Sequence, residues 1–257
     1  FTSGFDRHRG HNHRDENSFT FFARGERFAI DPGYEPRETR AHNTVLVNGM
    51  GQASDKGEYD VYGKTVHTED FGTAWSITGD ATAAFPEAAH VAEARRQFLF
   101  VRAATPYLVI ADEIETSTDG EAEYAWLLHT ARRNTIRLGK EPNTAIIEGA
   151  QRKAVCMVRF ITPQQGLVIA ETDLAGKTFE RRGRSHPYAR FFKELRAVRR
   201  AKRGRFIAIL TVADTPKDLP HVRSQGDPDD MAIEVDSSPE HPDHIRITPQ
   251  DIKFARR

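Results

Sequence analysis

Histidine and acidic residues that could carry chemistry are concentrated near the start of the chain. The stretch His11-Asn-His-Arg-Asp-Glu-Asn-Ser18 places His11, His13 and Asp15 at intervals of two residues. In an extended segment, residues two apart point to the same side, so these three side chains are expected to project together. Such ionisable groups are costly to bury on one side of a strand unless they bind a metal ion or take part in acid–base chemistry.

Two further candidate ligands follow on the next segments. Asp31 ends the predicted strand 27–30 and lies 18 residues after His13, and His42 opens an apolar run 11 residues later. Two imidazole nitrogens and one carboxylate oxygen, with a fourth position open to water, suit a zinc ion. His13, Asp31 and His42 fit such a zinc site, although their spacings alone are not diagnostic. The alternative is a plain histidine–carboxylate hydrogen-bond network, which the same residues could form.

The composition of the chain excludes several classes of partner. Its 37 basic and 37 acidic residues cancel, so no long-range field points to nucleic acid or to an anionic membrane surface. No apolar run approaches the roughly 20 residues of a membrane-spanning helix. The single cysteine, Cys156, excludes an intrachain disulfide and a thiolate zinc cluster, and its apolar neighbours predict a buried thiol. We interpret the basic runs 180–184 and 196–205 as solvated surface, with a groove for an acidic sugar chain as the alternative.

Short β-rich runs separated by turn residues recur along the chain and must position these side chains. Several alternate between apolar and polar residues, which predicts a large two-sheet antiparallel β-sandwich. Residues 1–215 are expected to form the sandwich that carries the site, and residues 216–257 to add loops and one or two edge strands of the same sandwich. The one helical candidate, 81–95, is interrupted by Pro86. The predicted strands include 18–23, 28–31, 44–47, 97–101, 107–110, 144–147, 155–160 and 206–212.

Several isolated residues are predicted to be structural. Trp75 and Trp126 lie in β-rich segments and are expected in the core rather than as platforms for sugar rings. His129 is expected to be a core or surface histidine rather than a ligand. A serine hydrolase is disfavoured, because the sequence contains no G-x-S-x-G motif.

The front of the chain resembles the β-sandwich region of the heparinase II/III superfamily of polysaccharide lyases. The resemblance is concentrated in residues 8–52. Beyond them it rests on the general pattern of short strands and on Ala125-Trp-Leu-Leu-His129. It implies an N-terminal (α/α) toroid before the sandwich, with the substrate in the cleft between them, and this chain is expected to lack the toroid. The runs that carry the resemblance are His11-x-His13-x-Asp15-x-Asn17-Ser18-Phe19, Ala29-Ile-Asp31-x-Gly33 and Ala41-His-Asn-Thr-Val45.

The resemblance also implies roles for individual residues. His13, Asp31 and His42 match zinc ligands, and His11 matches a catalytic histidine that faces the substrate. Tyr34 lies in the loop where some relatives carry a functional tyrosine. The implied reaction removes the C5 proton of a uronic acid and expels the 4-linked sugar, and the substrate carboxylate must be neutralised by polar or cationic groups. Histidine suits proton transfer in such a site near neutral pH.

The implied partners are an acidic polysaccharide and the toroid domain of the same protein, and the resemblance also allows a homodimer. It implies a periplasmic or secreted bacterial protein. A non-catalytic carbohydrate-binding or assembly module on the same fold is the alternative function. The combination of His11 with His13, Asp31 and His42 favours the lyase, because a binding module has no need of it.

Overall fold

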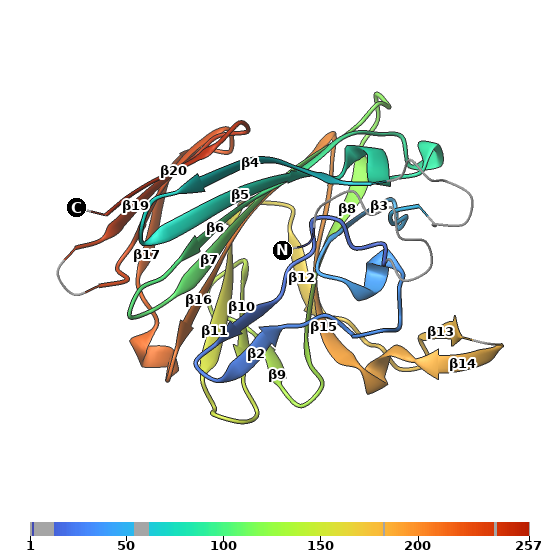
Figure 1. Cartoon of the computed structure of the whole chain (residues 1–257), viewed down its shortest axis with the longest axis horizontal. Helices are drawn as coiled ribbons and strands as arrows, with labels where there is room; N and C mark the ends of the chain where they lie inside the picture. Colours follow the sequence, from blue (N-terminus) through green and yellow to red (C-terminus); the bar gives the residue numbers. More distant parts are fainter. Residues whose placement is uncertain (1, 3–12, 54–61, 182, 239–240, 257) are drawn as a thin grey trace.

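The computed structural model describes residues 2, 13–53, 62–181, 183–238 and 241–256, so the predicted catalytic residue His11 lies outside the described residues. Over these ranges the chain forms twenty β-strands and five short 3-10 helices, and it forms no α-helix. The prediction of an all-β antiparallel sandwich is confirmed, and its sheets lie in layers (Figure 1). Within the described ranges, a search for membrane-spanning helices finds none.

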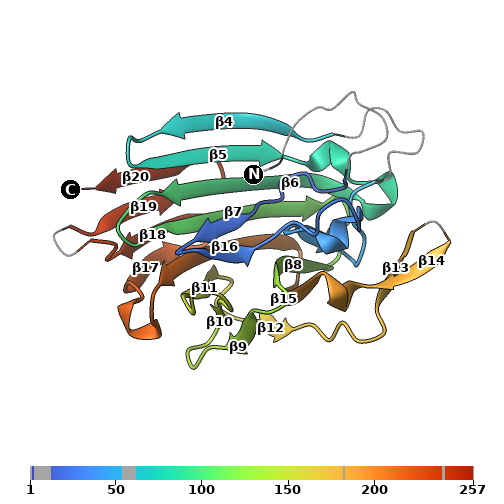
Figure 2. The same cartoon turned by 60° about the horizontal axis from the view of Figure 1, so that its bottom comes forward.

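An eight-stranded antiparallel sheet forms the centre of the molecule, and Figure 2 shows its strands β4 to β7 side by side. Alternate residues face opposite sides of this sheet, so that Phe98 belongs to one hydrophobic core and Leu99 to another. Because both faces are covered, β7 is buried along almost its whole length. In sheet order the strands are β4 (Lys64–Asp70), β5 (Ala74–Asp80), β6 (Val91–Val101), β7 (Tyr107–Thr116), β16 (Arg203–Ala213), β11 (Val155–Thr162), β10 (Thr144–Glu148) and β9 (Thr135–Leu138).

One face of the central sheet is covered by a four-stranded sheet and a hairpin. Trp126 packs edge-on against Phe160 with ring centroids 5.1 Å apart, and it is fully buried as predicted. Trp75, in contrast, is 48% exposed on the strand next to the edge strand β4, so its predicted core position is wrong. The covering strands are β12 (Val168–Glu171), β15 (Phe192–Ala201), β8 (Ala122–Ala131) and β3 (Val45–Val47), and the hairpin is β1 (Phe21–Ala23) and β2 (Glu26–Ala29).

The opposite face is covered by a four-stranded sheet formed by the C-terminal segment. This separate sheet takes the place of the predicted loops with one or two edge strands. Its alternating residues Met231, Ile233 and Val235 pack in one core with Leu99 and Ile209 of the central sheet. The many Asp, Pro and His residues of the turns favoured the interpretation of this segment as loops. The strands are β17 (Val222–Asp227), β18 (Asp230–Val235), β19 (Asp243–Ile247) and β20 (Ile252–Arg256).

The helical candidate 81–95 is not a helix. It contains two 3-10 helices separated by Pro86, and from Val91 onward it is the long strand β6. The short hairpin of β13 (Thr178–Arg181) and β14 (Arg184–Pro187) extends away from the layers (Figure 1). The 3-10 helices are η1 (Thr39–Ala41), η2 (Thr82–Ala84), η3 (Glu87–Ala89), η4 (Tyr188–Arg190) and η5 (Pro216–Asp218).

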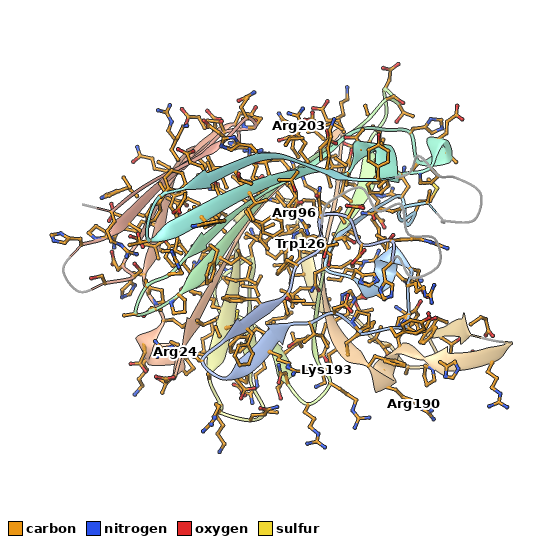
Figure 3. The ribbon with its side chains drawn as sticks, viewed as in Figure 1. Arg24, Arg96, Trp126, Arg190, Lys193 and Arg203 are labelled. Atoms are coloured by element: carbon orange, nitrogen blue, oxygen red, sulfur yellow. The ribbon has the colours of Figure 1, made fainter. Side chains whose placement is uncertain are left out.

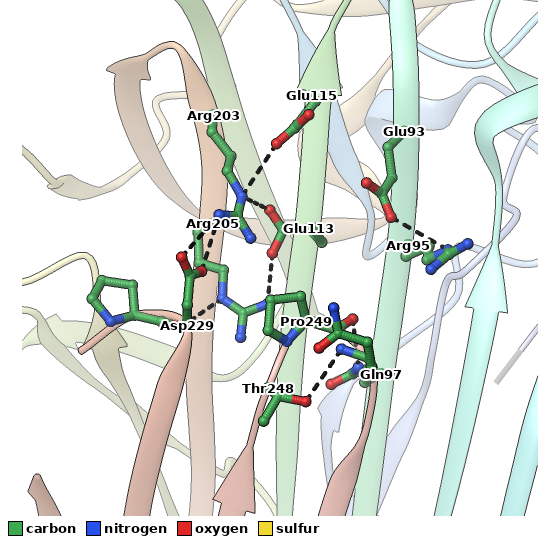
Figure 4. A network of polar contacts seen from close by, with 12 residues as sticks. Glu93, Arg95, Gln97, Glu113, Glu115, Arg203, Arg205, Asp229, Thr248 and Pro249 are labelled. Carbon is green, nitrogen blue, oxygen red and sulfur yellow. Dashed lines mark hydrogen bonds and ion pairs between the residues drawn. The ribbon is translucent and has the colours of Figure 1, made fainter. Parts of the chain in front are cut away.

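The basic run 196–205 ends in a network of ion pairs that joins the central sheet to the C-terminal sheet (Figure 4). Arg203 contacts Glu113 of β7 and lies 3.0 Å from Asp229, which precedes β18. Arg205 is 3% exposed and pairs with the same Glu113 at 2.6 Å. The interpretation of this run as solvated surface is therefore wrong for Arg205, which is a structural residue between the layers.

Candidate metal centre

The three predicted metal ligands lie together, although they come from separate segments. His13 precedes β1, Asp31 follows β2, and His42 lies between η1 and β3. One ligand atom from each residue lies within 4.8 Å of those of the other two. The Nδ1 atom of His42 is 3.1 Å from Oδ2 of Asp31, and the His13 and His42 rings have centroids 5.1 Å apart. We call these three residues the ligand cluster.

Local backbone structure fixes the orientation of Asp31. The backbone N–H of Gly33 donates to Oδ1 of Asp31 at 2.7 Å, which leaves Oδ2 to face His42. Gly33 has a φ of 91°, in the left-handed region that glycine adopts without strain. The backbone N–H of Ile30, the residue before Asp31, donates to the carbonyl of His129 at 2.9 Å and connects this segment to β8. The carboxylate therefore has one oxygen held by the turn and one directed into the cluster.

His42 supplies the buried part of the cluster. Its side chain is fully buried, and its Nε2 atom has no hydrogen-bond partner among the residues that the structure describes. A buried polar atom without a partner costs about 1–3 kcal/mol, so a nitrogen of this kind needs a ligand or a water molecule. Two atoms bound to one tetrahedral zinc ion at about 2.0–2.1 Å lie about 3.4 Å apart, close to the 3.1 Å between His42 Nδ1 and Asp31 Oδ2. The donor set and the spacing of Nδ1 and Oδ2 fit a shared metal ion, and Nε2, on the other side of the imidazole ring, then needs a separate partner such as a water molecule.

The charges at the site favour an ionised Asp31. Burial alone would raise the pKa of Asp31, but hydrogen bonds with His42 and with the Gly33 amide lower it below its ordinary value. Asp15 interacts electrostatically with all three members of the cluster. Burial raises the pKa of Asp15, and the attraction of His42 and His13 only partly opposes this effect. A second carboxyl group thus lies beside the ligand cluster, as the spacing of His13 and Asp15 in the sequence predicted.

Tyr34 occupies the loop between Asp31 and His42 and is 53% exposed. The guanidinium group of Arg37 lies over its ring, 4.8 Å from the centroid, in cation–π geometry. An exposed phenol beside a cationic group could contact an anionic ligand.

Sequence reasoning missed the polar groups behind the cluster. His129 is fully buried, with Nε2 3.1 Å from Oε2 of Glu194 and Nδ1 3.2 Å from Oδ1 of Asn43. Burial lowers the pKa of His129, and the hydrogen bond with His129 outweighs burial and lowers the pKa of Glu194. His129 is thus a core histidine, which was one of the two positions expected for it. Because β8 pairs with β15, His129 and Glu194 lie directly opposite each other. No local sequence signal could reveal this pairing.

Comparison with known folds gives several solved structures that resemble the chain. The heparan sulfate lyase of Pedobacter heparinus superposes with a TM-score of 0.64 at 12% identity, over 95% of this chain and 37% of that chain. Two heparinase III structures superpose with TM-scores of 0.62 and 0.60, at 15% and 12% identity, over 92% and 95% of this chain and 36% of each of theirs. At these identities the likeness concerns the fold. The chain thus spans a little over a third of the length of these enzymes.

At the level of sequence, no curated protein matches the chain significantly. The family model described as heparinase II/III-like, C-terminal matches residues 2–187, which is well over half of the 257 residues. The matched range contains every member of the ligand cluster. The chain therefore belongs to the heparinase II/III-like C-terminal family.

Proposed function

We propose that the chain is the zinc-bearing β-sandwich part of a polysaccharide lyase that cleaves uronic-acid-containing chains by β-elimination. The observation that carries this proposal is the convergence of His13, Asp31 and His42 from three separate segments on one point. The family to which the chain belongs, and the heparan sulfate lyase and heparinase III names of its structural neighbours, support a lyase acting on an acidic polysaccharide.

His13, Asp31 and His42 would hold the zinc ion. When bound, zinc would supply a fixed positive charge that organises this side of the substrate cleft. Its ligands are two imidazole nitrogens and one carboxylate oxygen, a donor set that suits zinc better than a hard cation such as magnesium or calcium. The three residues thereby tie the segments before β1, after β2 and before β3 to one another.

The β-elimination reaction also needs groups that transfer protons and neutralise the substrate carboxylate. A base removes the C5 proton, the C4–O bond breaks, a C4=C5 double bond forms, and the departing sugar oxygen receives a proton. We propose that His11 transfers one of these protons at the substrate face, and that Tyr34 contributes its hydroxyl group from the neighbouring loop. We propose that Arg37, which lies over the Tyr34 ring and pairs with Glu35 at 3.2 Å, also directs positive charge toward the substrate carboxylate.

Other groups that this reaction needs would come from a toroid domain of the same protein, because the chain matches only about 37% of the length of the heparan sulfate lyase. Polysaccharides of this class are extracellular polymers, so we propose that the protein acts in the periplasm or outside the cell.

The test is turnover by the intact protein that carries this chain. The formation of unsaturated uronides is followed by absorbance on heparan sulfate, on alginate and on a neutral polysaccharide. We expect activity on an acidic polymer alone, and a loss on the order of 10²-fold in His42→Ala, the scale of a disrupted metal site or positioned proton-transfer group. His244→Ala is the control, because His244 lies half-exposed on β19 of the opposite layer.

Binding of the polysaccharide without any turnover would instead favour the non-catalytic module. Full activity of His42→Ala together with unchanged zinc content would contradict the proposed site.

A further inference from the structure

Asn43, the residue after His42, directs its side-chain amide nitrogen at two segments near the ligand cluster and its amide oxygen at His129 of β8. It is fully buried. Its Nδ2 donates to the carbonyl of Phe19 at 2.6 Å and to the carbonyl of Ile30 at 3.0 Å. Its Oδ1 accepts the backbone N–H of His129 at 2.6 Å. Since Ile30 immediately precedes Asp31, one amide group joins the segments of Asp31 and His42 and the start of the hairpin.

The backbone of Asn43 is held as firmly as its side chain. Its N–H donates to Oγ of Ser18 at 3.2 Å, which connects it to the segment that begins at His13. Its carbonyl accepts a hydrogen bond from Nη1 of Arg96 at 2.6 Å. Asn43 therefore links its own segment, which carries His42, to the segments of His13 and Asp31 through hydrogen bonds of 3.2 Å and 3.0 Å.

Arg96 anchors these segments to the central sheet. It is 2% exposed on β6, and the same Nη1 that reaches Asn43 also donates to the carbonyl of Asn17 at 2.9 Å. The other side of its guanidinium group binds Asp112 of β7 through Nε at 2.5 Å and Nη2 at 3.1 Å. Asp112 also accepts the Nε1–H of Trp126 at 3.1 Å, and Figure 3 shows Arg96 and Trp126 together between the layers.

We propose that Asn43 and Arg96 are positioning residues that set the spacing of His13, Asp31 and His42 before a metal ion binds. The inference rests on the proposed metal site and extends it to groups that touch neither metal nor substrate. Groups behind a metal site commonly change its affinity 10–100-fold, because ligands displaced by about 0.5 Å no longer share one ion well.

The fold supplies a matched comparison for Arg96. Arg205 is equally buried, lies on β16 of the same central sheet, and binds the carboxylate of Glu113 at 2.6 Å. It faces the opposite layer, and its Nε donates to the carbonyl of Pro228 rather than to a ligand-bearing segment. A purely structural role would make the two arginines equivalent with respect to metal binding.

The experiment compares Arg96→Lys with Arg205→Lys, since lysine keeps the charge beside each carboxylate and loses the guanidinium fork. Zinc affinity is measured by competition with a chromophoric chelator, below the melting temperature of every variant. We expect both variants to lose thermal stability. We expect Arg96→Lys to bind zinc about 10–100-fold more weakly, and Arg205→Lys to stay within about 2-fold of the wild type. Asn43→Ser should lose zinc affinity to a similar extent as Arg96→Lys, and it serves as the second variant if Arg96→Lys does not fold.

Hydrogen exchange of the metal-free proteins is the second measurement. Amides in segments 13–18 and 42–44 should exchange faster in Arg96→Lys than in Arg205→Lys, whether or not zinc binds. A wild type that binds no zinc would refute the proposed metal site, and faster exchange in those segments would still support the positioning role. Equal zinc affinity and equal exchange in the two lysine variants would overturn the inference.

Discussion

Asp31 and His42 meet at 3.1 Å, Oδ2 to Nδ1, although Asp31 lies in an exposed turn and His42 is fully buried. The contact brings a carboxylate oxygen from outside the core to an imidazole within it. A proton or a metal ion can occupy the space between these two atoms. The proposed site therefore depends on which of them is present in solution.

Zinc is expected to raise the melting temperature of the protein through this contact. A ligand that binds only the folded state at 100 times its dissociation constant adds about 2.7 kcal/mol to the free energy of unfolding. Asp31→Asn removes a charged ligand and should abolish most of the shift. Scanning calorimetry with and without zinc, together with elemental analysis, measures both effects. An equal shift in Asp31→Asn and the wild type would show that zinc binds elsewhere.

The two front histidines are expected to differ in their effects on stability. His13→Ala should lower both the melting temperature of the zinc-loaded protein and its activity, because losing a ligand loses metal-binding free energy that contributes to folding. His11→Ala should lower activity alone, because a substrate-facing histidine adds little packing. Thermal unfolding and turnover of the intact protein are measured for both variants. Equal losses of melting temperature would contradict this division of roles.

The ligand cluster could be predicted because its signals are local. His13 lies in a dense polar motif, and Asp31 and His42 adjoin runs whose β-pattern is easily read. The residues that hold the cluster could not be found in this way. Arg96 is 53 residues from Asn43 along the chain, and their contact arises only when β6 packs under the loop before β3. Periodicity within one segment contains no information about such a pairing.

The errors in the fold prediction have a similar physical origin. The alternation of Met231, Ile233 and Val235 is visible in the sequence, but it predicts a buried face without saying what covers it. Trp75 shows the converse case, because its strand pattern resembles that of a core strand while its place near the sheet edge leaves it exposed. Burial depends on which layer lies above a residue, and that is set by the topology of the whole chain.

The C-terminal sheet should lose stability in acid through Asp243. Burial alone would raise the pKa of Asp243, but hydrogen bonds from Arg256, Ser237 and Tyr107 lower it below its ordinary value. A carboxylate with a lowered pKa stabilises the fold above the unfolded value of about 3.9, and this contribution disappears as the pH falls through the folded value.

Asp243→Asn should therefore have a lower melting temperature than the wild type at pH 7, and the difference should narrow as the pH falls below about 4. Thermal unfolding monitored by circular dichroism from pH 7 to pH 2 measures it. A difference that stays constant over this range would assign the effect of the substitution to packing alone.

Residues 1–257 alone are expected to show negligible lyase activity on heparan sulfate, alginate or related uronates. Catalysis requires base, proton donor and carboxylate-neutralising groups to lie within hydrogen-bond reach of one sugar ring. The chain matches a little over a third of the heparan sulfate lyase, and the proposed site supplies only the groups around His11, Tyr34 and the ligand cluster.

The absorbance of unsaturated uronides is measured for this chain and for the intact protein at equal concentration. The intact protein should turn over, and its His11→Ala variant should lose on the order of 10²-fold or more. Strong turnover by the chain alone would show that the sandwich holds the complete site, and an intact protein indifferent to His11 would favour the carbohydrate-binding module.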